Sequence, residues 1–216
     1  MKIFKRIIKK VLSFLNITVK GKNAHFPGSA NYWERRYKDG GNSGDGSYGS
    51  LADFKADVLN SFVESNQIKS VIDFGCGDGN QTKLANYPNY LGFDVSQKAI
   101  ENCKKIFSDD NKKVFMLMKD YNGEEAELAI SLDVIYHLIE DQVFHDYMQL
   151  LFNASQKYVI IYSSNYDLKY ESNSHMRHRE FTKWISTYCD NWHLIRNIEQ
   201  KYPQRTSAEF YIYKRE

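Results

Sequence analysis

The sequence has little of what marks a secreted or membrane-spanning protein. Its three cysteines, Cys76, Cys103 and Cys189, are too few and too far apart for a disulfide framework or a cysteine zinc site. No apolar run approaches the roughly 20 residues that a membrane-spanning helix needs. Internal repeats and low-complexity tracts are also absent. These absences favour one globular domain in the reducing cytoplasm.

Positive charge is scarce outside one short segment. Residues 1–20 contain six basic and no acidic side chains, which leaves 23 basic and 27 acidic residues in the rest of the chain, a formal charge of −4. A nucleic-acid-binding domain needs a basic surface to meet the phosphate backbone. We therefore expect no nucleic-acid partner for the main part of the chain.

The basic segment, residues 1–20, is predicted to be an amphipathic helix, because its apolar side chains recur at steps of three and four. The apolar face is formed by Ile3, Phe4, Ile7, Ile8, Val11, Leu12, Phe14 and Leu15. Such a helix suits the headgroup layer of an anionic membrane, where each cation contributes up to about 1 kcal/mol. Docking on the protein's own surface or on another subunit fits equally well. A signal peptide does not, since cations interrupt the apolar run and no small-residue cleavage site follows.

Residues 21–50 are predicted to form a loop. An aromatic and arginine cluster that includes Trp33 and Arg36 is followed by five glycines within residues 40–49. Glycine at this density favours a surface segment over a core element. We interpret the segment as a lid over a ligand, in which Arg36 binds a carboxylate and aromatic rings such as Trp33 shield a cation. A tether to the N-terminal helix is the alternative, although it leaves the aromatic residues unexplained.

Residues 51–216 have the pattern of one α/β domain. Strands are predicted at 69–75, 90–94, 113–118, 127–135 and 157–164, with a closing pair at 192–200 and 207–215. Helices are predicted at 51–63, at 96–107 with Ser96 as N-cap, at 140–154 and at 181–189. This alternation predicts a parallel sheet with helices on both faces.

The most informative motif is VIDFGCGDGN at residues 71–80. Gly75, Gly77 and Gly79 follow a strand and lead into a helix, where a β-carbon would obstruct a ligand that approaches the backbone closely. Their G-x-G-x-G spacing differs from the G-x-G-x-x-G that binds a dinucleotide pyrophosphate. Asp73, just before the first glycine, attracts an ammonium group and repels a pyrophosphate. The motif therefore predicts a nucleoside ligand that carries a cation.

Polar residues also follow the next three strands. Asp94 ends the second strand, where a carboxylate can accept hydrogen bonds from both ribose hydroxyls. Asp120 and Tyr121 follow the third strand and suit an exocyclic amine and a purine face. The fourth strand ends at Leu132 and Asp133. Singly, Asp94 and Asp120 also fit turn or helix-capping roles, but the carboxyl ends of parallel strands meet at one edge, so we expect these residues to converge on one ligand.

These features resemble the class I S-adenosylmethionine (SAM)-dependent methyltransferase family over about residues 30–216, most specifically at DFGCGDG (73–79) and GFD (92–94). The resemblance implies SAM as cofactor and a Rossmann-like, seven-stranded, mostly parallel sheet with an antiparallel last strand. It also implies that Asp73 and the first two glycines hold the methionine part, Asp94 the ribose and Asp120 the adenine N6. The expected cofactor residues are Trp33, Arg36, Asp73, Gly75, Cys76, Gly77, Asp94, Val95, Asp120, Tyr121 and Leu132.

Residues beyond the fourth strand are candidates for catalysis. Methyl transfer from a sulfonium is an in-line displacement, so a hydroxyl acceptor needs correct placement and a base for its proton. His137 titrates near neutral pH and is the candidate base, with Asp133 and Tyr136 as further catalytic candidates. A histidine packed at a helix start, or one that contacts SAM without proton transfer, fits the sequence as well.

The polar loop HMRHRE, residues 175–180, is the candidate acceptor site. Its arginines and histidines suit a phosphate or carboxylate, although a solvated loop paired with local acids is the alternative. We expect no metal, because two histidines with only Glu171 and Glu180 nearby are too few ligands. The expected acceptor-binding residues are Tyr48, His175, Arg177, His178 and Arg179.

Together these features predict a SAM-dependent O-methyltransferase that acts on a sugar or a sugar-linked phosphate or phosphoramidate. Three blocks, residues 32–49, 131–141 and 175–182, look similar to a bacterial subgroup associated with surface-polysaccharide and capsule assembly. An N- or C-methyltransferase of a small metabolite and a non-catalytic SAM-binding module are the alternatives. We expect a cytoplasmic enzyme with a small-molecule or glycan acceptor, in peripheral contact with the inner face of the membrane through residues 1–20; the sequence leaves the oligomeric state open.

Overall fold

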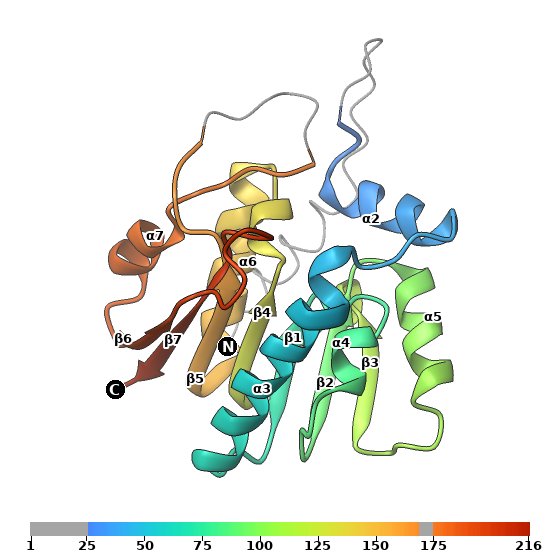
Figure 1. Cartoon of the computed structure of the whole chain (residues 1–216), viewed down its shortest axis with the longest axis horizontal. Coiled ribbons are helices and arrows are strands. Elements are labelled where there is room, and N and C mark those ends of the chain that lie inside the picture. Colours follow the sequence, from blue (N-terminus) through green and yellow to red (C-terminus); the bar gives the residue numbers. More distant parts are fainter. Residues whose placement is uncertain (1–25, 169–174) are drawn as a thin grey trace.

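The structure is built around one sheet with helices on both faces (Figure 1). The computed structural model describes residues 26–168 and 175–216, so the helix predicted for residues 1–20 lies outside the described residues. The helices are α2 (Ser29–Lys38), α3 (Gly49–Ser65), α4 (Asn80–Lys83), α5 (Gln97–Ile106), α6 (Asp141–Asn153) and α7 (Phe181–Tyr188), with 3₁₀ helices η1 (Asp45–Ser47), η2 (Met118–Asp120) and η3 (Ile135–His137). The strands are β1 (Val71–Phe74), β2 (Tyr90–Asp94), β3 (Lys113–Leu117), β4 (Ala126–Leu132), β5 (Ser155–Ser163), β6 (Trp192–Ile198) and β7 (Glu209–Arg215).

The seven strands lie in the order β3-β2-β1-β4-β5-β7-β6. β1 pairs in parallel with β2 and β4, β2 with β3, and β4 with β5, whereas β7 is antiparallel to its neighbours β5 and β6. This confirms the prediction of a mostly parallel sheet with an antiparallel last strand. The chain winds outward from β1 on one side and from β4 on the other, and ligands bind such sheets at the carboxyl ends of the strands beside this reversal.

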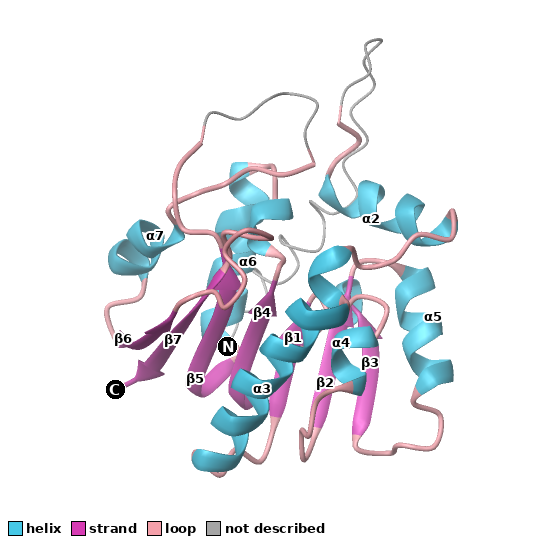
Figure 2. Cartoon of the chain, viewed as in Figure 1, coloured by secondary structure: helices cyan, strands magenta, loops and turns pink. Residues whose placement is uncertain are grey.

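Alternate residues of the central strands pack into two apolar layers, one on each face of the sheet. In β5, Val159 and Ile161 belong to one layer and Ile160 and Tyr162 to the other, as the period of two along a strand requires. Helices α6 and α7 complete the first layer, and α3 and α5 the second (Figure 2). Because both faces are covered, the sheet offers polar groups to a ligand only at the ends of its strands.

The loop predicted for residues 21–50 is in part a helix, which corrects the sequence analysis. Ala30, Trp33 and Tyr37 of α2 are spaced by three and four residues and so share one face, and Tyr37 is only 4 % exposed. The glycine-rich residues 40–49 do form turns, interrupted by η1. A loop was predicted because of the many glycines, although the spacing of Ala30, Trp33 and Tyr37 already indicated a helix. Helix α2 lies over the carboxyl ends of the strands, next to α5 (Figure 1).

Candidate active site

A pocket opens at the carboxyl ends of the central strands, beneath α2. It encloses about 1150 Å³, its open mouth included. Ten of the predicted site residues line it: Trp33, Asp73, Gly75, Cys76, Gly77, Asp94, Val95, Leu132, Asp133 and His137. The wall also contains residues that the sequence analysis did not single out, among them Lys55, Gln81, Met118 and Asp146. The motif residues therefore meet in one pocket.

The glycines of the motif are needed because protein atoms surround the turn. Gly75 has a φ of 111°, and a β-carbon there would lie 2.4 Å from Cγ2 of Val134. Gly77 has a φ of 60°, and its β-carbon would lie 2.4 Å from Oγ of Ser43. From the sequence, the missing side chains were expected to leave space for a ligand. The structure adds a second reason, since the loop after β4 and the segment before η1 both approach the turn closely.

Asp73 lines the pocket and has one buried, unpaired oxygen. The Tyr90 hydroxyl donates to Oδ2 at 2.7 Å, while Oδ1 has no hydrogen-bond partner among the described residues. Gln81 lines the same pocket; its Nε2 donates to the Ala52 carbonyl at 3.1 Å, which fixes the amide orientation and leaves Oε1 unpaired. Burial raises the pKa of Asp73 to about 7. Two buried acceptors without donors fit a ligand that carries an ammonium group.

Asp94 is held rigidly at the end of β2. Its Oδ2 accepts from the Gly77 backbone N–H at 3.0 Å and its Oδ1 from the Ser96 N–H at 2.8 Å. A carboxylate has about four acceptor positions, so two remain for a pair of vicinal hydroxyls. Burial raises the pKa of Asp94 to about 6. Ser96 also caps α5 as predicted, because its Oγ accepts from the Ala99 N–H.

Asp133 lies in a buried polar network that the sequence did not indicate. Lys55 of α3, only 1 % exposed, donates from Nζ to Oδ2 of Asp133 at 2.6 Å, and the Tyr136 hydroxyl donates to Oδ1 at 2.8 Å. Burial raises the pKa of Tyr136 well above its usual range, so this hydroxyl keeps its proton. Tyr136 does not line the pocket, and both Asp133 oxygens are engaged. Neither residue is therefore available as a base.

His137 is a neutral imidazole with one free nitrogen. Its Nδ1 lies 3.0 Å from the backbone carbonyl of His175, and because a carbonyl only accepts, Nδ1 carries the proton. No protein donor or acceptor binds Nε2 among the described residues. Burial lowers the pKa of His137 to about 4. Its ring meets Trp33 edge to face at 4.9 Å and stacks on His175 at 5.5 Å, and His175 in turn stacks on Tyr32 at 4.9 Å.

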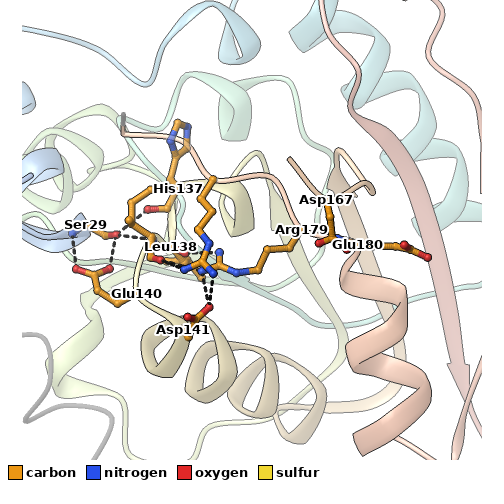
Figure 3. A network of polar contacts seen from close by, with 10 residues as sticks. Ser29, His137, Leu138, Glu140, Asp141, Asp167, Arg179 and Glu180 are labelled. Atoms are coloured by element: carbon orange, nitrogen blue, oxygen red, sulfur yellow. Dashed lines mark hydrogen bonds and ion pairs between the residues drawn. The ribbon is translucent and has the colours of Figure 1, made fainter. Parts of the chain in front are cut away.

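The predicted anion site in residues 175–180 is not formed, which corrects the sequence analysis. Arg177 and Arg179 both contact Oδ1 of Asp141, at 2.9 and 3.1 Å, and both donate to backbone carbonyls between η3 and α6 (Figure 3). His178 lies 2.6 Å from the Ser164 hydroxyl. The structure fits the alternative stated from the sequence, in which the loop pairs with a local acid; that acid is Asp141. None of its four predicted acceptor residues lines the pocket.

Arg36 and Tyr48 also have structural partners in place of the predicted ligands. The Nε of Arg36 donates to the Asn42 carbonyl at 2.6 Å, and the guanidinium lies over the Trp33 ring, 5.6 Å from its centre. The Tyr48 hydroxyl donates to Oδ2 of Asp78 at 2.7 Å. These contacts hold the glycine-rich segment in place, and neither side chain lines the pocket.

The residues predicted to hold adenine point elsewhere. Asp120 is exposed, and the Tyr121 hydroxyl donates to the Glu124 carbonyl at 2.9 Å with its ring in the core. The cause is η2, a tight turn of 3₁₀ helix that directs Met118 to the pocket wall and turns Asp120 outward. This short helix was not predictable from the sequence, since three residues are too few for a periodic pattern.

Two further kinds of site are absent from the part of the chain that the structure describes. Within residues 26–168 and 175–216, no helix combines the length and apolar character that crossing a bilayer requires. In the same ranges, no three or more His, Cys, Asp or Glu side chains gather closely enough to hold a metal ion. The pocket beneath α2 is thus the site to explain.

No family model and no curated protein matches the chain in sequence. Many solved structures match its fold. Magnesium protoporphyrin IX methyltransferase (ChlM) from Synechocystis PCC 6803 with bound SAH is 16 % identical with a TM-score of 0.62, over 87 % of this chain and 95 % of that one. The N-methyltransferase NodS from Bradyrhizobium japonicum WM9, in complex with S-adenosyl-L-homocysteine (SAH), is 12 % identical with a TM-score of 0.63, over 87 % and 98 %.

A third match is the methyltransferase domain of bacterial CtHen1, 17 % identical with a TM-score of 0.62, over 76 % of this chain and 98 % of that one. One of these proteins is named for a porphyrin acceptor and another for N-methylation, and the identity of all three to this chain is low. The likeness therefore concerns the fold and not the acceptor. The chain has the Rossmann-like fold of the class I SAM-dependent methyltransferases.

Proposed function

We propose that the protein binds SAM in the pocket beneath α2 and transfers its methyl group to an acceptor at the pocket mouth. The observation that carries the proposal is the pair of buried, unpaired acceptors, Asp73 Oδ1 and Gln81 Oε1, beside the glycine turn. Such atoms destabilise a ligand-free protein unless a donor reaches them. The ammonium of the methionine part of SAM is a donor of that kind, and it supports SAM over a dinucleotide.

The other pocket residues fit the remaining parts of SAM. Asp94 has acceptor positions left for the two ribose hydroxyls. Lys55 is the one lysine or arginine among the lining residues, so it supplies the positive charge for the methionine carboxylate, the role that the sequence assigned to Arg36. When bound, SAM supplies an activated methyl group on a sulfonium. The protein's task is to hold the acceptor in line with that bond and to take up a proton.

We propose a sugar hydroxyl as the acceptor and His137 as the group that receives its proton. Two observations support this: among the described residues, Nε2 of His137 has no protein partner, and the His137 ring contacts the rings of Trp33 and His175. Tyr32 stacks in turn on His175. Stacked rings suit the apolar face of a sugar. We do not retain the sugar-linked phosphate expected from the sequence, because the arginines expected to bind it, Arg177 and Arg179, are paired with Asp141. The link to surface glycans depends on the similarity of residues 32–49, 131–141 and 175–182 to the polysaccharide-associated subgroup.

Calorimetric titration with SAH tests the cofactor site. The wild type is expected to bind SAH, and Asp94→Ala to weaken binding about 100-fold, since two hydrogen bonds to a charged group are lost. Glu101→Ala, on the exposed face of α5, is the matched control and should bind as the wild type does. Absence of heat from both SAM and SAH with the folded wild type would overturn the proposal.

A transfer assay tests the acceptor. SAM with a labelled methyl group is incubated with panels of nucleotide sugars and capsule fragments, with Asp94→Ala as the inactive control. Label in a sugar ether would support O-methylation. A parallel panel contains small metabolites. If label is found only on their nitrogen or carbon atoms, the sugar acceptor is wrong and the protein is an N- or C-methyltransferase. A wild type that binds SAH yet labels neither panel would favour a SAM-binding module.

The membrane contact is proposed for residues 1–20, which lie outside the described residues. Their six cations and apolar stripe support peripheral binding to anionic lipid. Flotation with liposomes that contain phosphatidylglycerol compares the whole chain with one that begins at residue 26. We expect only the whole chain to float, and less so at high salt. Equal flotation of both chains would contradict the proposal.

A further inference from the structure

Asp146 of α6 is a buried carboxylate with no role in the site described so far. The pocket-lining residues of α6 recur at steps of three and four, so one face of the helix forms this wall. The other residues on that face are Val143, Tyr147 and Leu150. Asp146 is 8 % exposed, and a carboxylate is exceptional among such neighbours.

The Asp146 carboxylate is incompletely paired. Gln142, one turn earlier in α6, donates from Nε2 to Oδ1 at 2.8 Å. Among residues 26–168 and 175–216, no donor bonds to Oδ2 and no cation forms an ion pair with Asp146. Oδ2 is not one of the fully buried side-chain atoms that lack a partner, so it still reaches solvent in the pocket, and a ligand that fills the pocket would displace that water. A donor on a ligand would satisfy the remaining oxygen.

The position of Asp146 indicates which part of a nucleoside supplies that donor. Val95 follows Asp94 directly, and Met118 follows β3 on the neighbouring strand end. Val95 and Met118 pack in the same apolar layer as Tyr147 and Leu150, next to Asp146 on α6. A flat base attached to a ribose at Asp94 would therefore meet these apolar side chains, in the same pocket that the Asp146 carboxylate lines.

We infer that Asp146 Oδ2 accepts a hydrogen bond from the exocyclic amine of adenine, the role that the sequence analysis gave to Asp120. The inference rests on the proposed SAM site and adds the group that distinguishes adenine from other purines. A carboxylate only accepts, so it favours an amine at this position and disfavours a carbonyl. Asp120 is exposed and outside the pocket wall.

Calorimetric titration with SAH and with S-inosylhomocysteine, in which a carbonyl replaces the amine, tests the inference. The wild type is expected to bind SAH about 10- to 100-fold more tightly than the inosine compound, the range for one hydrogen bond to a charged group. In Asp146→Asn, the amide can donate to the carbonyl, so this ratio should fall towards 1. Asp120→Asn should leave the ratio unchanged. Asn matches Asp in shape, and thermal unfolding of each variant checks its fold.

The outcomes separate the inference from the proposed function. If the wild type binds neither compound, the SAM site itself is wrong and the inference is rejected with it. If the wild type binds SAH and Asp146→Asn keeps the wild-type ratio, Asp146 does not contact the amine and the inference alone is overturned. A ratio that changes in Asp120→Asn and not in Asp146→Asn would return the role to Asp120.

Discussion

Burial fixes the protonation state of His137. Its pKa is lowered to about 4, so the Nε2 lone pair is present at every pH above about 5. For a hydroxyl acceptor, we expect turnover to rise with pH through about 4 and then to stay level through pH 6.5, where an unperturbed histidine would titrate. At pH 7.5, His137→Gln should lower turnover about 100- to 10,000-fold, measured as labelled methyl transfer at saturating SAM.

The matched control for this prediction is His193 of β6, which is exposed and far from the pocket lining. His193→Gln should leave turnover unchanged. Two results would count against the assignment of His137: an inflection in the pH profile near 6.5, and turnover that survives in His137→Gln. The second result would favour an amine acceptor, which presents its own lone pair and needs no base on the protein.

Gly75 is constrained by both its backbone conformation and its surroundings. We predict that Gly75→Ala destabilises the protein by about 2–5 kcal/mol, because it adds overlap with Val134 to the strain of a positive φ. Gly40 has a φ of 81° and open space around it, so Gly40→Ala should cost only the strain, about 1–2 kcal/mol. Chemical denaturation of both variants gives the difference. Equal costs would show that Val134 moves aside freely.

At the residue scale, sequence motifs identified the site residues whose position follows from neighbouring residues along the chain. Asp73 was predicted because it lies just before the glycine turn, and Asp94 because it ends the second strand; the structure brings both to the pocket. Lys55, Gln81 and Asp146 were not predicted, since each lies on a helix and meets the pocket only through tertiary packing. A lone polar residue on a helix carries no signal of what it faces.

At the element scale, α2 is fastened on both sides of the pocket that it covers. Its first residue, Ser29, donates from Oγ to Glu140 at 2.8 Å, beyond β4 (Figure 3). In the middle of α2, Glu34 accepts from the Ser96 hydroxyl at 2.6 Å, beyond β2. Trp33, between these two attachments, and Tyr37, one turn further along α2, line the pocket. Bound SAM can therefore leave only when one attachment opens or through the mouth.

We predict that the double variant Ser29→Ala, Glu34→Gln loosens α2. Each attachment contributes about 1 kcal/mol, so SAH should dissociate roughly 10-fold faster in stopped-flow measurements, and amide exchange over residues 29–38 should accelerate. Lys38→Ala is the control, because it removes an exposed ion pair with Glu34 that stabilises little. Unchanged exchange in the double variant would mean that packing alone holds the helix.

The order of strands and helices in residues 51–216 was predictable because each element there has a clear period and clear ends. Helix α2 was missed, since ten residues with one apolar stripe preceded a glycine-rich turn that dominated the composition. The 3₁₀ helix η2 was missed because it is too short to have a period, and its geometry moved Asp120 out of the pocket. Element type follows from periodicity, whereas the direction of a side chain after a strand depends on turns of a few residues.

At the scale of the whole molecule, Asp73 should couple stability to pH and to ligand binding. Its pKa is about 7 in the fold against a usual value of 3.8, so the folded state holds the proton more tightly than the unfolded chain. The stability that this proton contributes is fully present below pH 4 and is lost as pH rises to about 7. Ligand-free Asp73→Asn should therefore unfold at a temperature roughly 2–8 °C higher than the wild type at pH 8, and the gap should close towards pH 4.

The same shift predicts how binding depends on pH. An ammonium ligand needs the ionised carboxylate, so the wild type must release a proton from Asp73 when SAH binds below pH 7. The Asp73 contribution alone should increase SAH affinity nearly 10-fold between pH 5.5 and 6.5 and level off above pH 7.5. Calorimetry in buffers of different ionisation enthalpy measures the released proton directly. The pKa of Asp94, about 6, is also raised, so Asp94 adds its own pH dependence to SAH affinity. Asp73→Asn distinguishes the two contributions, because it removes only the pH dependence centred near pH 7. If that variant binds SAH as tightly as the wild type at pH 8, the unpaired oxygen of Asp73 does not meet the ammonium of the ligand.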